Sequence, residues 1–171
     1  MALIWFDAHG DLNTPDSSPS GHFHGMPLRT LLGEGDPQIL NNCFSLLNPN
    51  QLFMIGARDL DAAERDFIDQ HNIATFGPQT DPSQVVQAVQ KAGFQNVYLH
   101  FDLDVLSPEE FTNMIFQVDD GLPIQTALQL VNQLSNHFRV VGSSLLEYVG
   151  DQAAQHEEFL QQLAGKLTNL T

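Results

Sequence analysis

Two short clusters in this chain bring together residue types that bind metal ions. Asp7, His9 and Asp11 alternate along one segment, and Asp102 and Asp104 alternate along another. Alternate residues of an extended chain point to the same side, so each cluster should present its side chains together. Carboxylates held side by side disfavour one another's ionisation unless a divalent cation lies between them. The pattern is therefore typical of a two-metal hydrolase site.

Both clusters directly follow short apolar runs. Residues 1–6 and 97–101 are rich in aliphatic and aromatic side chains, and they predict buried parallel strands. In open α/β sheets, ligands bind beyond the carboxyl ends of the strands, which is where both clusters would lie. The position of the clusters and their chemistry therefore agree.

The rest of the chain alternates between strand and helix patterns. Apolar periodicity, together with Pro or Asp at several helix starts, sets the expected bounds. The alternation predicts one α/β domain over 1–171 with three layers, α/β/α, in which a mainly parallel sheet lies between two layers of helices. Further strands are expected at 51–57, 73–76 and 138–147, and helices at 27–32, 37–48, 59–70, 81–93, 123–134 and 151–167.

The composition narrows the classes of partner. The chain has 21 Asp plus Glu against six Lys plus Arg, a formal net charge of −15. Such an acidic protein is a poor ligand for nucleic acid or anionic membranes and suits a cationic or zwitterionic substrate. The single cysteine, Cys43, excludes an internal disulfide. We expect a cytoplasmic protein, because no long apolar run and no signal-peptide pattern is present.

The motifs resemble those of the arginase and agmatinase family, the ureohydrolases. The string WFDAHGDLNTP at 5–15, followed by SGHFHG at 20–25, is similar to the first family motif almost throughout. The string DLDVLSP at 102–108 is similar to the second, with Ser107 in place of its last aspartate. The order and separation of the motifs also match, over nearly the whole chain.

This resemblance implies a binuclear manganese centre and a urea-releasing hydrolase of linear amidine or guanidino compounds, in which a metal-bridging hydroxide attacks the guanidinium carbon. Mostly oxygen donors with an imidazole suit Mn²⁺. The implied metal ligands are Asp7 and Asp102 as bridges, His9 and Asp104 on one ion, and Asp11 on the other, where it also orients the hydroxide.

The resemblance also implies roles for residues outside the two clusters. His24 corresponds to the proton-shuttling histidine, and Glu147 to the acid beside the guanidinium group. Asn13, Ser20, His22 and Asp61 correspond to positions that contact the substrate. From the residues alone, Asp61 could equally favour the start of a helix through its charge.

The chain also departs from the family pattern. Members carry a Gly-Gly-Asp-His segment before the first cluster, whose histidine completes one metal site, whereas this sequence begins at the strand bearing Asp7. We therefore expect an amino-terminally truncated member with one weakened metal site. The family's Gly- and Thr-rich substrate loop is replaced by bulkier residues at 109–116, so the substrate itself does not carry over. The last strand, 139–146, should be an exposed edge that pairs in a homo-oligomer through Val140 and Leu145.

His100 has the same parity as Asp102 and Asp104 and should point to the same side of its strand. Because it lies deeper, we expect it to hydrogen-bond a metal ligand, with direct ligation as the alternative. Two other readings of the whole chain stay open. One is an inactive arginase-like remnant or interaction subunit with one or no metal, and the other is a zinc deacylase of related fold.

Overall fold

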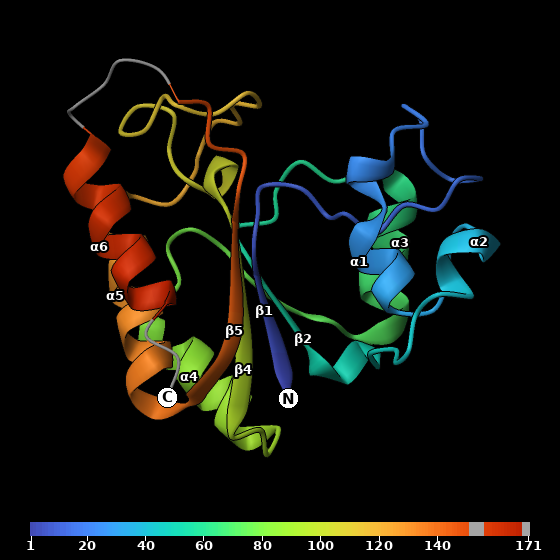
Figure 1. Ribbon diagram of the computed structural model, residues 1–171, viewed down its shortest axis with the longest axis horizontal. Coiled ribbons are helices and arrows are strands. Elements are labelled where there is room, and N and C mark those ends of the chain that lie inside the picture. Colours follow the sequence, from blue (N-terminus) through green and yellow to red (C-terminus); the bar gives the residue numbers. More distant parts are fainter. Residues whose placement is uncertain (151–155, 169–171) are drawn as a thin grey trace.

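A computed structural model describes residues 1–150 and 156–168. Its centre is a five-stranded sheet in the order β3-β2-β1-β4-β5, in which every neighbouring pair is parallel (Figure 1). The two strands that precede the clusters, β1 and β4, lie side by side in the middle. The strands are β1 (Ala2–Phe6), β2 (Leu52–Ile55), β3 (Ala74–Phe76), β4 (Asn96–Asp102) and β5 (Arg139–Leu146).

Helices cover both faces of this sheet. On one face, α4 (Pro82–Lys91), α5 (Ile124–His137) and α6 (Glu157–Leu167) bury apolar stripes against the strands. On the other face, α1 (Pro27–Leu31) and α3 (Ala62–His71) pack over β1 and β2, with α2 (Pro37–Leu40) lying farther out (Figure 1). Alternate residues of β1 enter opposite cores, which is how a strand buried on both faces behaves. The predicted three-layer α/β/α fold is confirmed.

The expected elements agree with the observed ones except at a few bounds. The helix expected at 37–48 ends at Leu40, because none of its residues is buried and no packed face extends it. The helix expected at 59–70 begins only after Asp61, which is its N-cap. The helix expected from 151 is seen from Glu157, and 151–155 lie outside the described residues.

Within the described residues, β5 pairs with β4 alone and is an edge of the sheet, as expected. The expected interface residues differ in exposure, however. Val140 is 2% exposed because it belongs to the core under the helices, whereas Val141 and Leu145 are 42% and 37% exposed. Val140 therefore already has its apolar contacts within the chain. No described helix is long and apolar enough to cross a membrane.

Candidate metal centre

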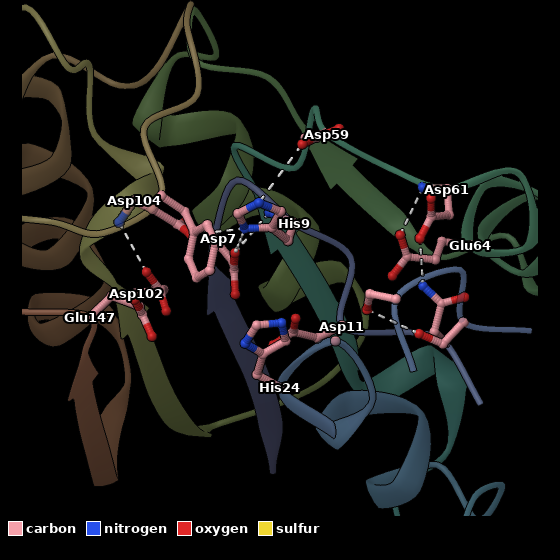
Figure 2. A pocket seen from close by; sticks show the side chains of 15 residues that line it. Asp7, His9, Asp11, His24, Asp59, Asp61, Glu64, Asp102, Asp104 and Glu147 are labelled. Carbon is pink, nitrogen blue, oxygen red and sulfur yellow. Dashed lines mark hydrogen bonds and ion pairs between the residues drawn. The ribbon is translucent and has the colours of Figure 1, made fainter. Parts of the chain in front are cut away.

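A pocket opens at the carboxyl ends of β1 and β4 (Figure 2). Asp102, Asp104 and Glu147 lie on one side of it, Asp61 lies on the far side, and the first cluster lies between them. All five predicted metal ligands therefore meet in one cavity. The lining residues are Asp7, His9, Asp11, Asn13, Ser18, Ser20, His24, Gly25, Asp59, Asp61, Glu64, Asp102, Asp104, Phe116 and Glu147.

The first cluster starts where β1 ends. Asp7 is 2% exposed, and its two carboxylate oxygens accept hydrogen bonds from the His9 amide at 2.7 Å and the Trp5 indole N–H at 3.2 Å. Asp11 has a left-handed backbone with φ of 54°, so the cluster turns rather than running on as a strand. Strained backbone of this kind occurs often at functional sites, where neighbouring contacts hold it.

Gly10 makes that turn possible. A Cβ atom at this position would lie 2.6 Å from the Glu64 carboxylate, closer than real contacts allow. The same carboxylate accepts hydrogen bonds from the backbone amides of Leu12 and Asp61. Glu64 thus ties the first cluster to the start of α3, a contact that the sequence did not predict.

The second cluster reaches the pocket in a different way from the one expected. Asp102 is the last residue of β4, and Asp104 lies in the 3-10 turn Leu103–Val105, so the two do not alternate along a strand. The Asp102 carboxylate instead accepts a hydrogen bond from the Asp104 amide at 2.9 Å and closes the turn. The Asp104 carboxylate then accepts one from the Ala8 amide at 2.9 Å, which joins the clusters.

Arg58, which follows β2, anchors this turn and was not anticipated. Its guanidinium group donates hydrogen bonds to several backbone carbonyl groups, including those of Asp104 and Val105. The same group holds the segment at Val118 and Asp119 through their carbonyl oxygens. The only hint in the sequence is that Arg58, one of only six Lys and Arg residues, directly follows the strand expected at 51–57.

Three aspartates in the pocket have strongly raised pKa values. Burial, reinforced by the charge of Asp7, raises the pKa of Asp11 and of Asp102 to about 9. Burial also raises the pKa of Asp7 to about 7. These carboxylates cannot all ionise together without a nearby positive charge, as expected for ligands of a divalent cation.

His9 provides positive charge when no metal is bound. Its Nδ1 lies 2.8 Å from Asp104 and 3.4 Å from Asp7, and hydrogen bonds to these two carboxylates raise its pKa to about 11. Burial opposes ionisation of Asp104, but hydrogen bonds from His9 and the Ala8 amide leave its pKa lowered. A metal ion at this position would replace the His9 proton.

The donor geometry fits metal ions in two groups. Ligand atoms of Asp7, His9 and Asp104 all lie within 4.8 Å of one another, and so do those of Asp7, His100 and Asp102. Asp7 belongs to both groups, which is the arrangement a bridging carboxylate requires. The donor set of buried carboxylates and imidazole suits a hard or borderline divalent cation.

The predicted substrate residues are brought together only in part. Asn13 is buried and donates a hydrogen bond to Asp61 at 2.8 Å, while Ser20 and His24 line the pocket from an exposed loop. His22 is exposed and does not line the pocket. Its ring lies edge-on to the His24 ring, with the two centroids 5.4 Å apart, so any effect of His22 on the pocket is indirect. Asp61 both lines the pocket and caps α3, so the two expectations for it are compatible.

Phe116 and Glu147 also line the pocket. Phe116, from the divergent segment 109–116, has its ring edge-on to His9 at 6.0 Å and to His24 at 5.5 Å. Phe116 therefore lines the pocket beside both histidines. Glu147 follows β5 with a positive φ of 62°, and its Oε2 is buried without a hydrogen-bond partner among the described residues. The buried Oε2 marks Glu147 as a group with an unfilled polar contact.

The fold and the site define a class: three-layer α/β proteins with a carboxylate-rich pocket, able to hold metal ions, at the carboxyl edge of a parallel sheet. A sequence model of the Arginase family matches residues 1–166, and the chain belongs to that family. It is 39% identical over 144 residues to the arginase of Staphylococcus aureus strain COL, covering 78% of this chain and 48% of that protein. It is 35% identical over 174 residues to the arginase of Bacillus subtilis strain 168, covering 87% and 59%.

Solved structures give the same fold. The arginase of Entamoeba histolytica in complex with L-ornithine superimposes with a TM-score of 0.89 at 24% identity, covering 98% of this chain and 60% of that one. The Bacillus subtilis arginase gives a TM-score of 0.86 at 26% identity, covering 99% and 62%. The chain spans about half the length of the Staphylococcus aureus arginase.

Proposed function

We propose that this protein is a manganese-dependent hydrolase that cleaves a C–N bond of a linear guanidino or amidine compound and releases urea or a related product. The observation that carries the proposal is the convergence of Asp7, His9 and Asp104 within 4.8 Å, with Asp7 shared by a second donor group. Membership of the Arginase family supports the same chemistry.

The proposed ligand sets follow the two clusters. Asp7 and Asp102 would be shared by both ions, His9 and Asp104 would hold one ion, and Asp11 would hold the other. Support for the first set is the hydrogen bond of 2.8 Å between His9 and Asp104, which keeps both side chains pointed at one position. Support for the second is the raised pKa of Asp11 and Asp102, since buried carboxylates of this kind bind a cation in place of protons.

When bound, the manganese ions supply an activated water at neutral pH and polarise the group under attack. The side chains of the chain perform the other steps. Asp11 orients the attacking oxygen, because its carboxylate accepts a hydrogen bond from the O–H of that oxygen. His24, exposed at the pocket rim, transfers a proton to the departing amine. Glu147 faces the guanidinium group, and its unpartnered Oε2 supports this role.

The far side of the pocket would receive the rest of the substrate. Asn13, Ser20 and Asp61 offer amide, hydroxyl and carboxylate groups at the lining. These groups suit an amine or an amino acid group at the end of the substrate farthest from the metal centre. His22 would act through His24, because its own ring lies outside the lining. Phe116 limits the width of the substrate between these groups and the metal centre.

The test combines metal stoichiometry with product release. Purified protein is dialysed against Mn²⁺ and analysed for metal, and urea is measured with arginine, agmatine and other guanidino compounds. Two bound ions and urea release support the proposal. One ion or none, with no urea from any compound, would instead establish the inactive remnant or interaction subunit, and a single zinc would favour a deacylase.

We further propose that the protein is a homo-oligomer through β5. Val141 and Leu145 are both exposed apolar residues of this edge strand, and edge strands pair readily with a second chain. Light scattering over a dilution series should show a dimer or larger species that Leu145→Lys shifts toward the monomer. The control Leu46→Lys, at an exposed leucine outside the sheet, should leave the mass unchanged. A wild-type monomer at every concentration contradicts the proposal.

A further inference from the structure

The imidazole of His100 is held in a fixed position directly beneath the metal centre. It pairs with Trp5 in the register of β4 and β1, and the two rings stack with centroids 3.4 Å apart and planes 4° apart. Trp5 in turn donates its indole N–H to the Asp7 carboxylate. The ring plane of His100 and the position of Asp7 are therefore fixed by the same side chain.

The two ring nitrogens of His100 have different surroundings. Nδ1 lies 2.9 Å from the Ser144 hydroxyl oxygen on β5. Nε2 is buried, and no described residue offers it a hydrogen-bond partner. The residue is only 6% exposed, so solvent does not readily provide one either. A stacked ring in a purely packing role would not need a nitrogen here, since a phenyl ring fills the same space.

The gap above the ring has the size of a metal site. A ring nitrogen of His100 and carboxylate oxygens of Asp7 and Asp102 lie within 4.8 Å of one another, yet within the described chain His100 hydrogen-bonds to neither carboxylate. Metal bonds of about 2.0–2.2 Å place donor atoms roughly 3 to 4.4 Å apart, so an ion between these atoms needs little movement. A direct hydrogen bond would need a larger closure.

We propose that His100 is a direct ligand, through Nε2, of the ion that also binds Asp7, Asp102 and Asp11, and that Ser144 positions it. This proposal rests on the metal centre of the proposed function. In this arrangement Nδ1–H donates a hydrogen bond to the Ser144 hydroxyl oxygen 2.9 Å away, which leaves the lone pair of Nε2 free for the ion. The geometry thus favours direct ligation over the hydrogen bond to a ligand that the sequence led us to expect.

The test uses His100→Phe, which keeps a flat ring against Trp5 and removes the donor nitrogen. Manganese affinity at each site is measured by equilibrium dialysis. We expect two ions in the wild type and at least a tenfold loss of affinity at one site in His100→Phe, with the other site unchanged. Ser144→Ala should weaken the same site by a smaller factor. The control His137→Phe, at an exposed histidine on α5, should bind both ions normally.

A second measurement uses only the wild-type protein, so it does not depend on whether a variant folds. In the Co²⁺-loaded wild type, each coordinated imidazole gives a hyperfine-shifted exchangeable N–H resonance, and we expect two, from His9 and His100. Two tight ions with a single such resonance, or unchanged affinity in a folded His100→Phe, overturns the His100 proposal and leaves the proposed function standing. A wild type that binds neither Mn²⁺ nor Co²⁺ overturns both.

Discussion

The two sides of the pocket are built differently. On the metal side, Asp7, Asp102 and Asp104 are at most 7% exposed and are fixed by strand ends and backbone amides. On the substrate side, His24 and Phe116 are exposed, and they come from the short 3-10 turn Phe23–Gly25 and from a loop. The rigid side suits ligands whose spacing must be constant, and the loops suit contacts that vary with the substrate. Variants on the two sides should therefore separate metal binding from substrate selection.

The largest contrast is expected between Asp7→Asn and Asp61→Asn. Asp7 is the one carboxylate shared by both donor groups, so its neutral amide should lower manganese affinity at least about 100-fold and abolish urea release. Asp61→Asn should keep both ions and raise KM. Metal analysis and steady-state kinetics on the same preparations check this.

The melting temperature of the metal-free protein serves as the control for Asp7→Asn. It should stay close to wild type, because the amide removes a buried ionisable group while keeping one of the two oxygens that accept hydrogen bonds from Trp5 and His9. If Asp7→Asn binds manganese normally, or if Asp61→Asn loses it, the division into a metal side and a substrate side is wrong.

The same division explains what could be predicted from the sequence. The strands, the sheet type and the meeting of the clusters followed from apolar runs that end in carboxylates, since parallel strands place their carboxyl ends at one edge. The turn at Asp104 and its anchoring by Arg58 could not be predicted, because they depend on contacts between segments far apart in the chain. For the same reason, the position of Phe116 over His9 became clear only in the structure.

Glu147→Gln tests the boundary between the two sides. The amide keeps the shape but loses the charge that would pair with a guanidinium group, so kcat/KM should fall about 10- to 100-fold. Manganese affinity should change less than about twofold, because Glu147 is in neither donor group. Glu109→Gln, at an exposed glutamate of the replacement loop, should behave as wild type. A loss of metal in Glu147→Gln would move this residue to the metal side.

The metal side should also respond to pH. Asp11 and Asp102 have pKa values of about 9 in the folded protein against an ordinary value of 3.8, so the folded state holds protons that the unfolded chain releases. Their stabilising contribution is complete below about pH 4 and is lost as the pH rises toward 9. The raised pKa of His9 also makes the stability fall as the pH rises, between its ordinary value of 6.5 and its folded value of about 11.

Manganese competes with these protons, so its affinity should rise about tenfold per pH unit for each proton displaced between pH 7 and 8. Thermal melts with and without Mn²⁺ should show a falling melting temperature for the metal-free protein and a growing shift on metal addition. Asp7→Asn should lose most of that shift. A metal-free protein that becomes more stable from pH 6 to 9 contradicts the raised pKa values.

The smallest effect is expected at the substrate loop. Phe116→Ala removes the ring that lies edge-on to His9 and His24, which should widen the pocket and change KM a few-fold, in favour of bulkier guanidino compounds. Metal affinity should not change, because a phenyl ring offers no ligand atom. Phe44→Ala, at a fully exposed phenylalanine, is the matched control. If Phe116→Ala alters manganese binding but not substrate preference, the ring supports His9 in the metal centre, and the loop belongs to the rigid side of the pocket.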